Sequence, residues 1–234
     1  MSRETEGAGD EIAVQPVEGL PPEQVNKLIA ALVAVADASA GRDAGVLALL
    51  SVHPGLESAR MSFDTPFWGL DALMVAAQEE RLDAVRVLAP ICDAKQKASG
   101  QRQSELTALM IGCEARPMFE SWTDEEGSLA SQIALALIPW SDPEALDAAG
   151  MRALDRVLNW SSDALPLIQV LAAATDLERV IPAAKGSAMD SANAAGDDAR
   201  SIMAQALCEQ VARRERYELL GCLAPSESAA PRRM

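Results

Sequence analysis

The sequence contains few of the residues from which catalytic and metal sites are built. Its 234 residues include one histidine, His53, and four cysteines, no two of which form a C-x-x-C pair. Zinc sites need several such ligands at short spacing, so we predict no bound metal. A histidine-dependent triad would have to use His53, which stands in a His-Pro-Gly turn, and no G-x-S-x-G, P-loop or G-x-G-x-x-G motif is present. We therefore expect neither a cofactor nor an enzyme.

Long hydrophobic runs and a secretory signal are also missing. No stretch of 18 apolar residues occurs, so we expect no transmembrane helix. The acidic, polar N-terminus lacks the basic stretch and apolar core of a signal peptide. The four cysteines lie in apolar stretches without a disulfide pattern, which favours a reducing cytoplasm.

Positive charge is scarce. The formal net charge is −15, with a pI near 4.5, and direct binding of nucleic acid needs a basic surface that neutralises phosphates. We therefore predict no direct contact with nucleic acid. One alternative that the charge leaves open is an acidic mimic of nucleic acid that inhibits a DNA-binding protein, which would need carboxylates aligned on one face.

Aromatic residues make up only 3% of the chain, while alanine and leucine dominate. Alanine and unbranched side chains lose little freedom in a helix, so this composition predicts an all-α fold. Residues 1–20 and 225–234 have no apolar period and are predicted to be disordered, which leaves 21–224 as the folded domain. Apolar spacing and breakers then place helices over 22–40, 43–52, 70–79, 82–91, 105–114, 128–138, 143–160, 163–174, 176–184, 187–195 and 198–220. No β-strand is predicted.

An internal repeat is the sharpest signal in the chain. The stretch 69–77 contains Ala-Leu-Met, and the same three residues recur in 105–113, about 36 residues later. Looser copies follow at 150–158 and 187–192, and each copy is followed by a second apolar helix. Two short helices in each period are the layout of a helical solenoid, in which neighbouring pairs share one continuous core.

This unit resembles the ankyrin-repeat family, whose repeat opens with Gly-x-Thr-Pro-Leu-His-x-Ala-Ala and continues with Val-x-x-Leu-Leu. The matching positions are Gly69, Leu73, Ala76, Ala77, Val85 and Leu88, and then Thr107 and Leu109. Alanine stands where proline is usual at Ala72, Ala108 and Ala153, and the usual histidine is replaced at Met74, Met110 and Asp155. The resemblance implies a solenoid of about four to five helix-turn-helix repeats, clearest at 69–103 and 104–149.

The resemblance further implies a module that binds another protein through its concave face and inter-repeat loops. Adaptor, inhibitor and bacterial effector delivered to a host cell are the roles that it leaves open. The second repeat is about ten residues too long, and the surplus falls at 116–127, which predicts an inserted loop.

The scarce aromatics indicate where a partner binds. Several of them lie in the two longest segments between helices, where exposed tryptophans often anchor interfaces. The predicted partner-binding residues are Phe67, Trp68, Phe119, Trp122, Glu125 and Glu126. Aromatic anchors beside acidic residues would suit a basic partner surface, whereas rings that seal the solenoid would be core. An enzyme with a site that no motif reveals is the remaining alternative.

Overall fold

The computed structural model describes residues 15–39, 43–62, 64–99, 105–113, 124–160, 164–181 and 186–223. Within these ranges the fold is all-α apart from one pair of two-residue strands, β1 (Val180–Ile181) and β2 (Gly186–Ser187). The helices are α1 (Pro22–Ala38), α2 (Ala44–Val52), α3 (Ala72–Gln78), α4 (Leu82–Leu88), α5 (Ala108–Cys113), α6 (Asp124–Leu137), α7 (Ala153–Trp160), α8 (Leu165–Ala174), α9 (Ala188–Ala195) and α10 (Asp197–Leu223), with one 3-10 turn, η1 (Leu56–Ser58).

The first helix begins where the sequence predicts. Pro22 occupies its first turn, where a missing N–H leaves no hydrogen bond unmade. Ile29, Leu32, Val33 and Ala36 recur at helical spacing and form the buried face, which packs against α3 and α4, while α2 packs against α1. Before α1, the Gln15 N–H donates to the Val52 carbonyl at 2.7 Å, so residues 15–20, at the end of the segment 1–20, lie against this first pair.

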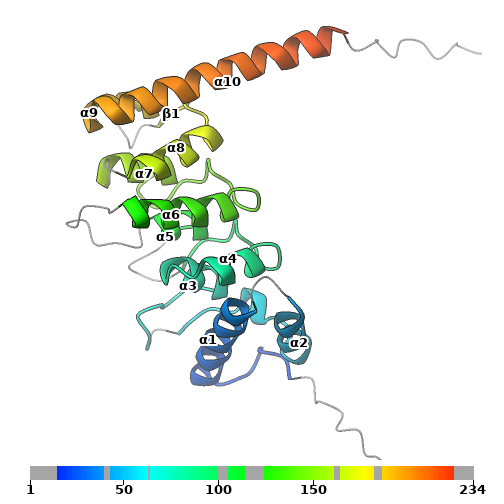
Figure 1. The fold of residues 1–234 in the computed structure, drawn as a ribbon. Helices are drawn as coiled ribbons and strands as arrows, with labels where there is room; N and C mark the ends of the chain where they lie inside the picture. The colour runs from blue at the N-terminus through cyan, green and yellow to red at the C-terminus, as the bar shows by residue number, and fades with distance from the viewer. Residues whose placement is uncertain are drawn as a thin grey trace, which may run out of the picture.

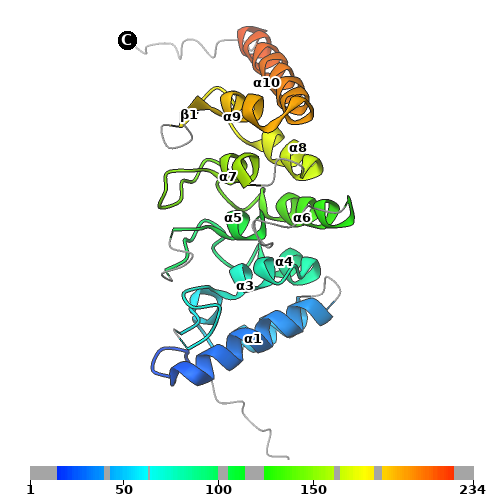
Figure 2. The same cartoon turned by 90° about the vertical axis from the view of Figure 1, so that its left-hand side faces the viewer.

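The following helices stack in two columns. α3, α5, α7 and α9 contact one another in that order, and α4, α6, α8 and α10 do the same beside them. Figure 2 shows the two columns side by side, and Figure 1 shows the pairs piled from the α1 end to the α10 end. Because each pair also packs internally, the apolar side chains of both columns merge into one core.

Small residues allow the columns to approach closely. Ala76 and Ala77 of α3 are fully buried, and Gly112 occupies a comparable position in α5. A Cβ on Gly112 would lie 2.9 Å from Cγ2 of Ile133 in α6 and 3.5 Å from Cβ of Ala77. Only a glycine therefore fits between α3, α5 and α6 without displacing the Ile133 side chain.

A turn closed by backbone hydrogen bonds or bridges precedes the first helix of each pair. The turns end just before α3, α5, α7 and α9, and in Figure 2 they lie along the same edge of the stack, which we call the turn edge. The paired positions are Met61 with Leu70, Lys97 with Thr107, Asp147 with Met151, and Val180 with Ser187.

Two of these turns correct helices that the sequence predicts. The predicted helix 143–160 begins only at Ala153, because the Asp147 carboxylate accepts from the Met151 N–H at 2.8 Å and Gly150 has a left-handed φ of 76°. In place of the predicted helix 176–184, residues 176–181 form a turn followed by β1, and 182–184 lie outside the described residues. There the Asp176 carboxylate accepts from the Glu178 N–H at 3.1 Å, a local bond that competes with helix formation.

The last helix differs from the others in length. α10 packs against α9 and α8, but it has 27 residues where α8 has ten. Figure 1 shows its C-terminal part extending past the stack. Despite this length, neither α10 nor any other helix in the described ranges is apolar enough to cross a membrane.

Candidate binding surfaces

Two of the predicted partner-binding residues lie on the first turn of the turn edge. Phe67 is half-buried and packs against the core, whereas Trp68 is 37% exposed. Arg60 holds this turn, because its Nη1 donates to the Gly69 carbonyl at 2.9 Å. Trp68 is therefore exposed to solvent on a turn whose backbone is held by hydrogen bonds, while the Phe67 side chain anchors the turn to the core.

The structure gives no side-chain position for the other four predicted residues. Phe119 and Trp122 lie outside the described residues, as do the side chains of Glu125 and Glu126. The backbone of these two glutamates belongs to α6, which begins at Asp124. The predicted loop 116–127 is corrected at this end: its last four residues are helical.

Basic side chains join neighbouring layers. The Arg60 Nη2 donates to the Lys97 carbonyl at 2.8 Å, and the Lys97 Nζ donates to the Leu146 carbonyl at 2.8 Å. The Arg152 Nη1 donates to the Asp176 carbonyl at 2.7 Å. The first two bonds join one turn to the next, and the third joins the start of α7 to the segment between α8 and β1, so neighbouring layers are held together.

Arg152 is also the centre of a buried charge network. Its side chain is completely buried, as is that of Asp155, and their Nε and Oδ2 atoms are 2.8 Å apart. Glu144, which is partly exposed, accepts from Arg152 at 3.2 Å and from Arg179 at 3.0 Å. Burial of a charge is costly unless it is paired and hydrogen-bonded, so Asp155 and Glu144 compensate the buried Arg152 charge where two layers meet.

The N-termini of α3 and α5 are capped at equivalent positions. The Asp71 Oδ1 accepts from the Met74 N–H at 2.9 Å, and the Thr107 hydroxyl lies 3.4 Å from the Met110 nitrogen. Burial of Asp71 raises the pKa of its carboxyl above the ordinary 3.8, although the Met74 N–H and the Arg60 guanidinium oppose that shift. The Asp71 and Thr107 side chains thus stabilise the first turn of their own helices.

A cleft of about 290 Å³ lies where α10 crosses the end of α8. Its floor is formed by the C-terminal residues of α8 and the turn that follows, and its roof by one face of α10. The lining residues are Ala173, Ala174, Thr175, Asp176, Gln210, Arg213, Arg214 and Tyr217.

Gln210 fixes the position of the cleft. Its Nε2 donates to the Ala172 carbonyl at 2.9 Å and to the Thr175 carbonyl at 2.7 Å. The last carbonyls of a helix have no partner within the helix, so α10 caps α8 through this one side chain. These two hydrogen bonds therefore fix the distance between α10 and the end of α8.

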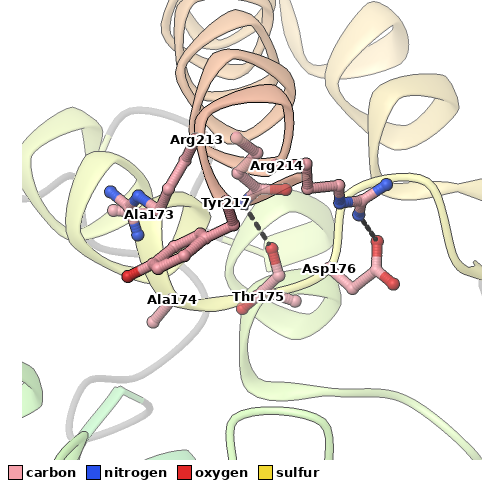
Figure 3. Close-up of a pocket in the computed structure, with 8 residues that line it drawn as sticks. Ala173, Ala174, Thr175, Asp176, Arg213, Arg214 and Tyr217 are labelled. Atoms are coloured by element: carbon pink, nitrogen blue, oxygen red, sulfur yellow. Dashed lines mark hydrogen bonds and ion pairs between the residues drawn. The ribbon is translucent and has the colours of Figure 1, made fainter. Parts of the chain in front are cut away.

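The two arginines of the cleft point in opposite directions. Arg214 reaches toward one side and pairs with Asp176 at 3.5 Å and with Glu178 at 2.5 Å. Figure 3 shows Arg213 on the other side, above Ala173, with the Tyr217 ring below it and beside Ala174. Tyr217 is 69% exposed, so this half of the cleft is open to solvent and combines a cation with an aromatic ring.

Sequence reasoning missed the cleft. It predicted a helix over 198–220 and assigned no role in binding to Gln210, Arg213, Arg214 or Tyr217. The available signal was the length of the final helical run, which continues from Asp197 to Leu223 without a glycine or proline until Gly221. A helix much longer than its neighbour must extend past the end of that neighbour and leave one of its own faces uncovered there.

His53 does not take part in either surface. Its Nδ1 lies 3.0 Å from the Gln15 carbonyl and so joins the end of α2 to the segment before α1. In the described ranges, no three histidine, cysteine or acidic side chains gather closely enough to hold a metal ion.

Comparison with known proteins adds no family assignment. Neither a scan against models of known protein families nor a search of curated proteins finds a match for this chain. Its function must be argued from the arrangement of its own residues.

Proposed function

We propose that this protein is a repeat scaffold of the ankyrin type that binds another protein and has no catalytic activity. The observation that carries the proposal is the layered arrangement: each helix pair from α3 to α10 is preceded by a turn, and the turns share one edge. Such an arrangement creates an extended surface for a macromolecule without needing any deep pocket.

The residue pattern at the start of each layer supports the ankyrin type. The position occupied by threonine in the family motif holds Asp71, Thr107 and Arg152 in successive layers. Asp71 and Thr107 cap their helices through side-chain oxygens. In the third layer Arg152 pairs with Asp155, which stands at the position of the usual histidine, and also binds the next turn. Different side chains at this position thus stabilise the start of each first helix, and in the third layer Arg152 also contacts the next layer.

The turn edge is the surface that we assign to partner binding. Trp68 on the first turn and Val180 on the last are exposed apolar side chains, and the second turn between them carries the ion pair of Lys97 and Glu105. Aromatic anchors within a polar setting are typical of protein interfaces. Phe119, Trp122, Glu125 and Glu126 stay predicted partner-binding residues without an assignment to the turn edge, and the two glutamates favour a partner with a basic surface.

Four carboxylates of the described residues are paired with basic side chains, which argues against a mimic of nucleic acid at those positions. The exposed carboxylates Asp37 and Glu79 share Arg81, Asp83 pairs with Arg86, and Glu105 pairs with Lys97. A phosphate-like row would need unpaired negative charges on one face. Acidic and basic side chains that alternate in this way form an ordinary solvated surface.

A capture experiment with matched variants tests the proposal. The full chain, Trp68→Ala and Leu135→Ala are used to capture proteins from extracts of the native organism, with identification by mass spectrometry. Leu135 is a suitable control because it is 57% exposed on α6, in the other column. A specific partner should be lost with Trp68→Ala and retained with Leu135→Ala. A partner retained by both variants, or lost with both, would remove the turn edge from the binding surface.

A further inference from the structure

The cleft between α8 and α10 contains an arginine that the fold does not use. Eight of the ten arginines in the described ranges lie within ion-pair distance of a carboxylate: Arg60, Arg81, Arg86, Arg152, Arg156, Arg179, Arg200 and Arg214. Within the same ranges Arg213 and Arg216 have no such partner. A chain with a net charge of −15 has carboxylates in excess, so an unpaired arginine inside a formed cleft is a specific feature.

The side chains around Arg213 determine which ligand group can bind in the cleft next to an anion. Ala173 and Ala174 provide a small apolar floor, and the Tyr217 ring covers it from α10. This combination accepts one short aliphatic side chain against the alanines and one carboxylate against the guanidinium. A phosphate or another free anion would leave the apolar floor and the ring without contacts.

The opposite side of the cleft sets the orientation of the ligand. Asp176 and Glu178 are held there by Arg214, and they repel a second negative charge. The carboxylate of a ligand is therefore restricted to the Arg213 side, and its neighbouring side chain to the alanine floor. The site discriminates by repulsion as well as by attraction.

We propose that this cleft binds an acidic segment of a partner protein, in which an Asp or Glu stands next to an aliphatic residue. The carboxylate pairs with Arg213, and the aliphatic side chain lies on Ala173 and Ala174 beneath Tyr217. This inference deepens the proposed scaffold function and rests on it, but it concerns a surface other than the turn edge. The two surfaces select partner segments of opposite charge.

Peptide selection on the full-length protein tests the inference. Random dodecapeptides displayed on phage are selected on the wild-type chain, and the enriched sequences are synthesised with a fluorescent label for anisotropy titrations. The consensus should contain Asp or Glu beside Ile, Leu, Val or Ala. The variants are Arg213→Glu, Tyr217→Ala, Trp68→Ala and the matched control Arg216→Glu, which reverses an unpaired charge on the same helix but outside the cleft.

Reversal of the Arg213 charge should weaken binding by at least about tenfold, because it replaces a charge-assisted hydrogen bond by repulsion. Tyr217→Ala should also weaken binding. Arg216→Glu should change it less than about twofold, the range expected for a charge screened by solvent. Trp68→Ala should also change it less than about twofold, because Trp68 lies on the turn edge and not in the cleft. Three results would overturn the inference: no enriched peptide, a consensus without acidic residues, or equal sensitivity to Arg213→Glu and Arg216→Glu.

The same variants separate this inference from the proposed function. If the peptides fail these tests while the natural partner still depends on Trp68, only the cleft assignment is lost. If the peptides depend on Arg213 while the natural partner ignores Trp68, the assignment of the turn edge is lost and the cleft remains a binding site.

Discussion

Arg152 and Asp155 lie three residues apart at the start of α7, both completely buried, with Nε and Oδ2 separated by 2.8 Å. The same guanidinium donates to the Asp176 carbonyl of the next turn at 2.7 Å. One arginine thus closes the local turn and joins two layers. Asp155 has Arg152 as its buried cation, so loss of Arg152 leaves a buried carboxylate without compensation.

Replacement of Arg152 should therefore be strongly destabilising. Arg152→Met leaves the Asp155 carboxylate buried and unpaired, and we expect a loss of about 3–5 kcal/mol in the free energy of unfolding. The double variant Arg152→Met/Asp155→Leu should lose less than the single variant, because the pair is removed together. Urea denaturation followed by circular dichroism measures both.

An exposed ion pair provides the control for that prediction. Arg200 pairs with Asp197 on the solvent side of α10 at 3.0 Å, and Arg200→Met should cost less than about 1 kcal/mol. Similar losses for Arg152→Met and Arg200→Met would show that the buried network does not stabilise the stack.

The cap of α3 predicts a pH dependence. Because the fold raises the pKa of Asp71, it favours the protonated carboxyl; the stabilisation from this group is fully present below 3.8 and is lost as the pH rises through the folded pKa. Asp71→Asn retains a capping oxygen without the charge. It should therefore be more stable than the wild type at neutral pH, and this advantage should disappear below 3.8. Urea midpoints across that range measure the difference, and a less stable Asp71→Asn at neutral pH would contradict the account.

The close packing at Gly112 predicts a steric effect. Gly112→Val would place methyl groups against Ile133 and Ala77, and overpacking of this kind costs about 1–3 kcal/mol. Ala204→Val, at an exposed position of α10, should cost only about 0.5 kcal/mol through helix propensity. Thermal unfolding of the two variants should separate them clearly, and equal melting temperatures would refute the close approach of α5 and α6.

The cysteines should differ in reactivity. Cys208 is exposed on α10, whereas burial raises the pKa of the Cys92 thiol to about 12. Only the thiolate is nucleophilic, so iodoacetamide under native, mildly alkaline conditions should modify Cys208 first and leave Cys92 intact until the protein unfolds. Peptide mass spectrometry over time distinguishes them; modification of Cys92 at the rate of Cys208 would show that its layer opens readily.

The sequence predicted most of the helices, because their apolar periodicity reports buried faces directly. Ile29, Leu32 and Val33 mark one face of α1, and the Ala-Leu-Met copies mark α3 and α5. It did not predict the turns before α7 and α9, where alanine-rich composition favours helix. Side-chain bonds from Asp147 and Asp176 to nearby backbone N–H groups decide those segments, and composition does not contain that information.

The candidate surfaces were predictable to different extents. Trp68 could be selected from the sequence because an aromatic residue in a long connecting segment is conspicuous, and the structure places it at the surface. The cleft could not, because Arg213 and Tyr217 meet Ala173 only through the height at which Gln210 holds α10 over α8. Such a site depends on the packing of helices that are distant in sequence.

The central claim is that the turn edge is the surface that contacts a partner protein. Photo-crosslinking tests it most directly, with a benzoylphenylalanine residue placed at position 68 or at position 135 and the crosslinked products identified by mass spectrometry. The account predicts that one partner is captured at position 68 and is absent at position 135. Capture at position 135 alone, or at both positions equally, would contradict it.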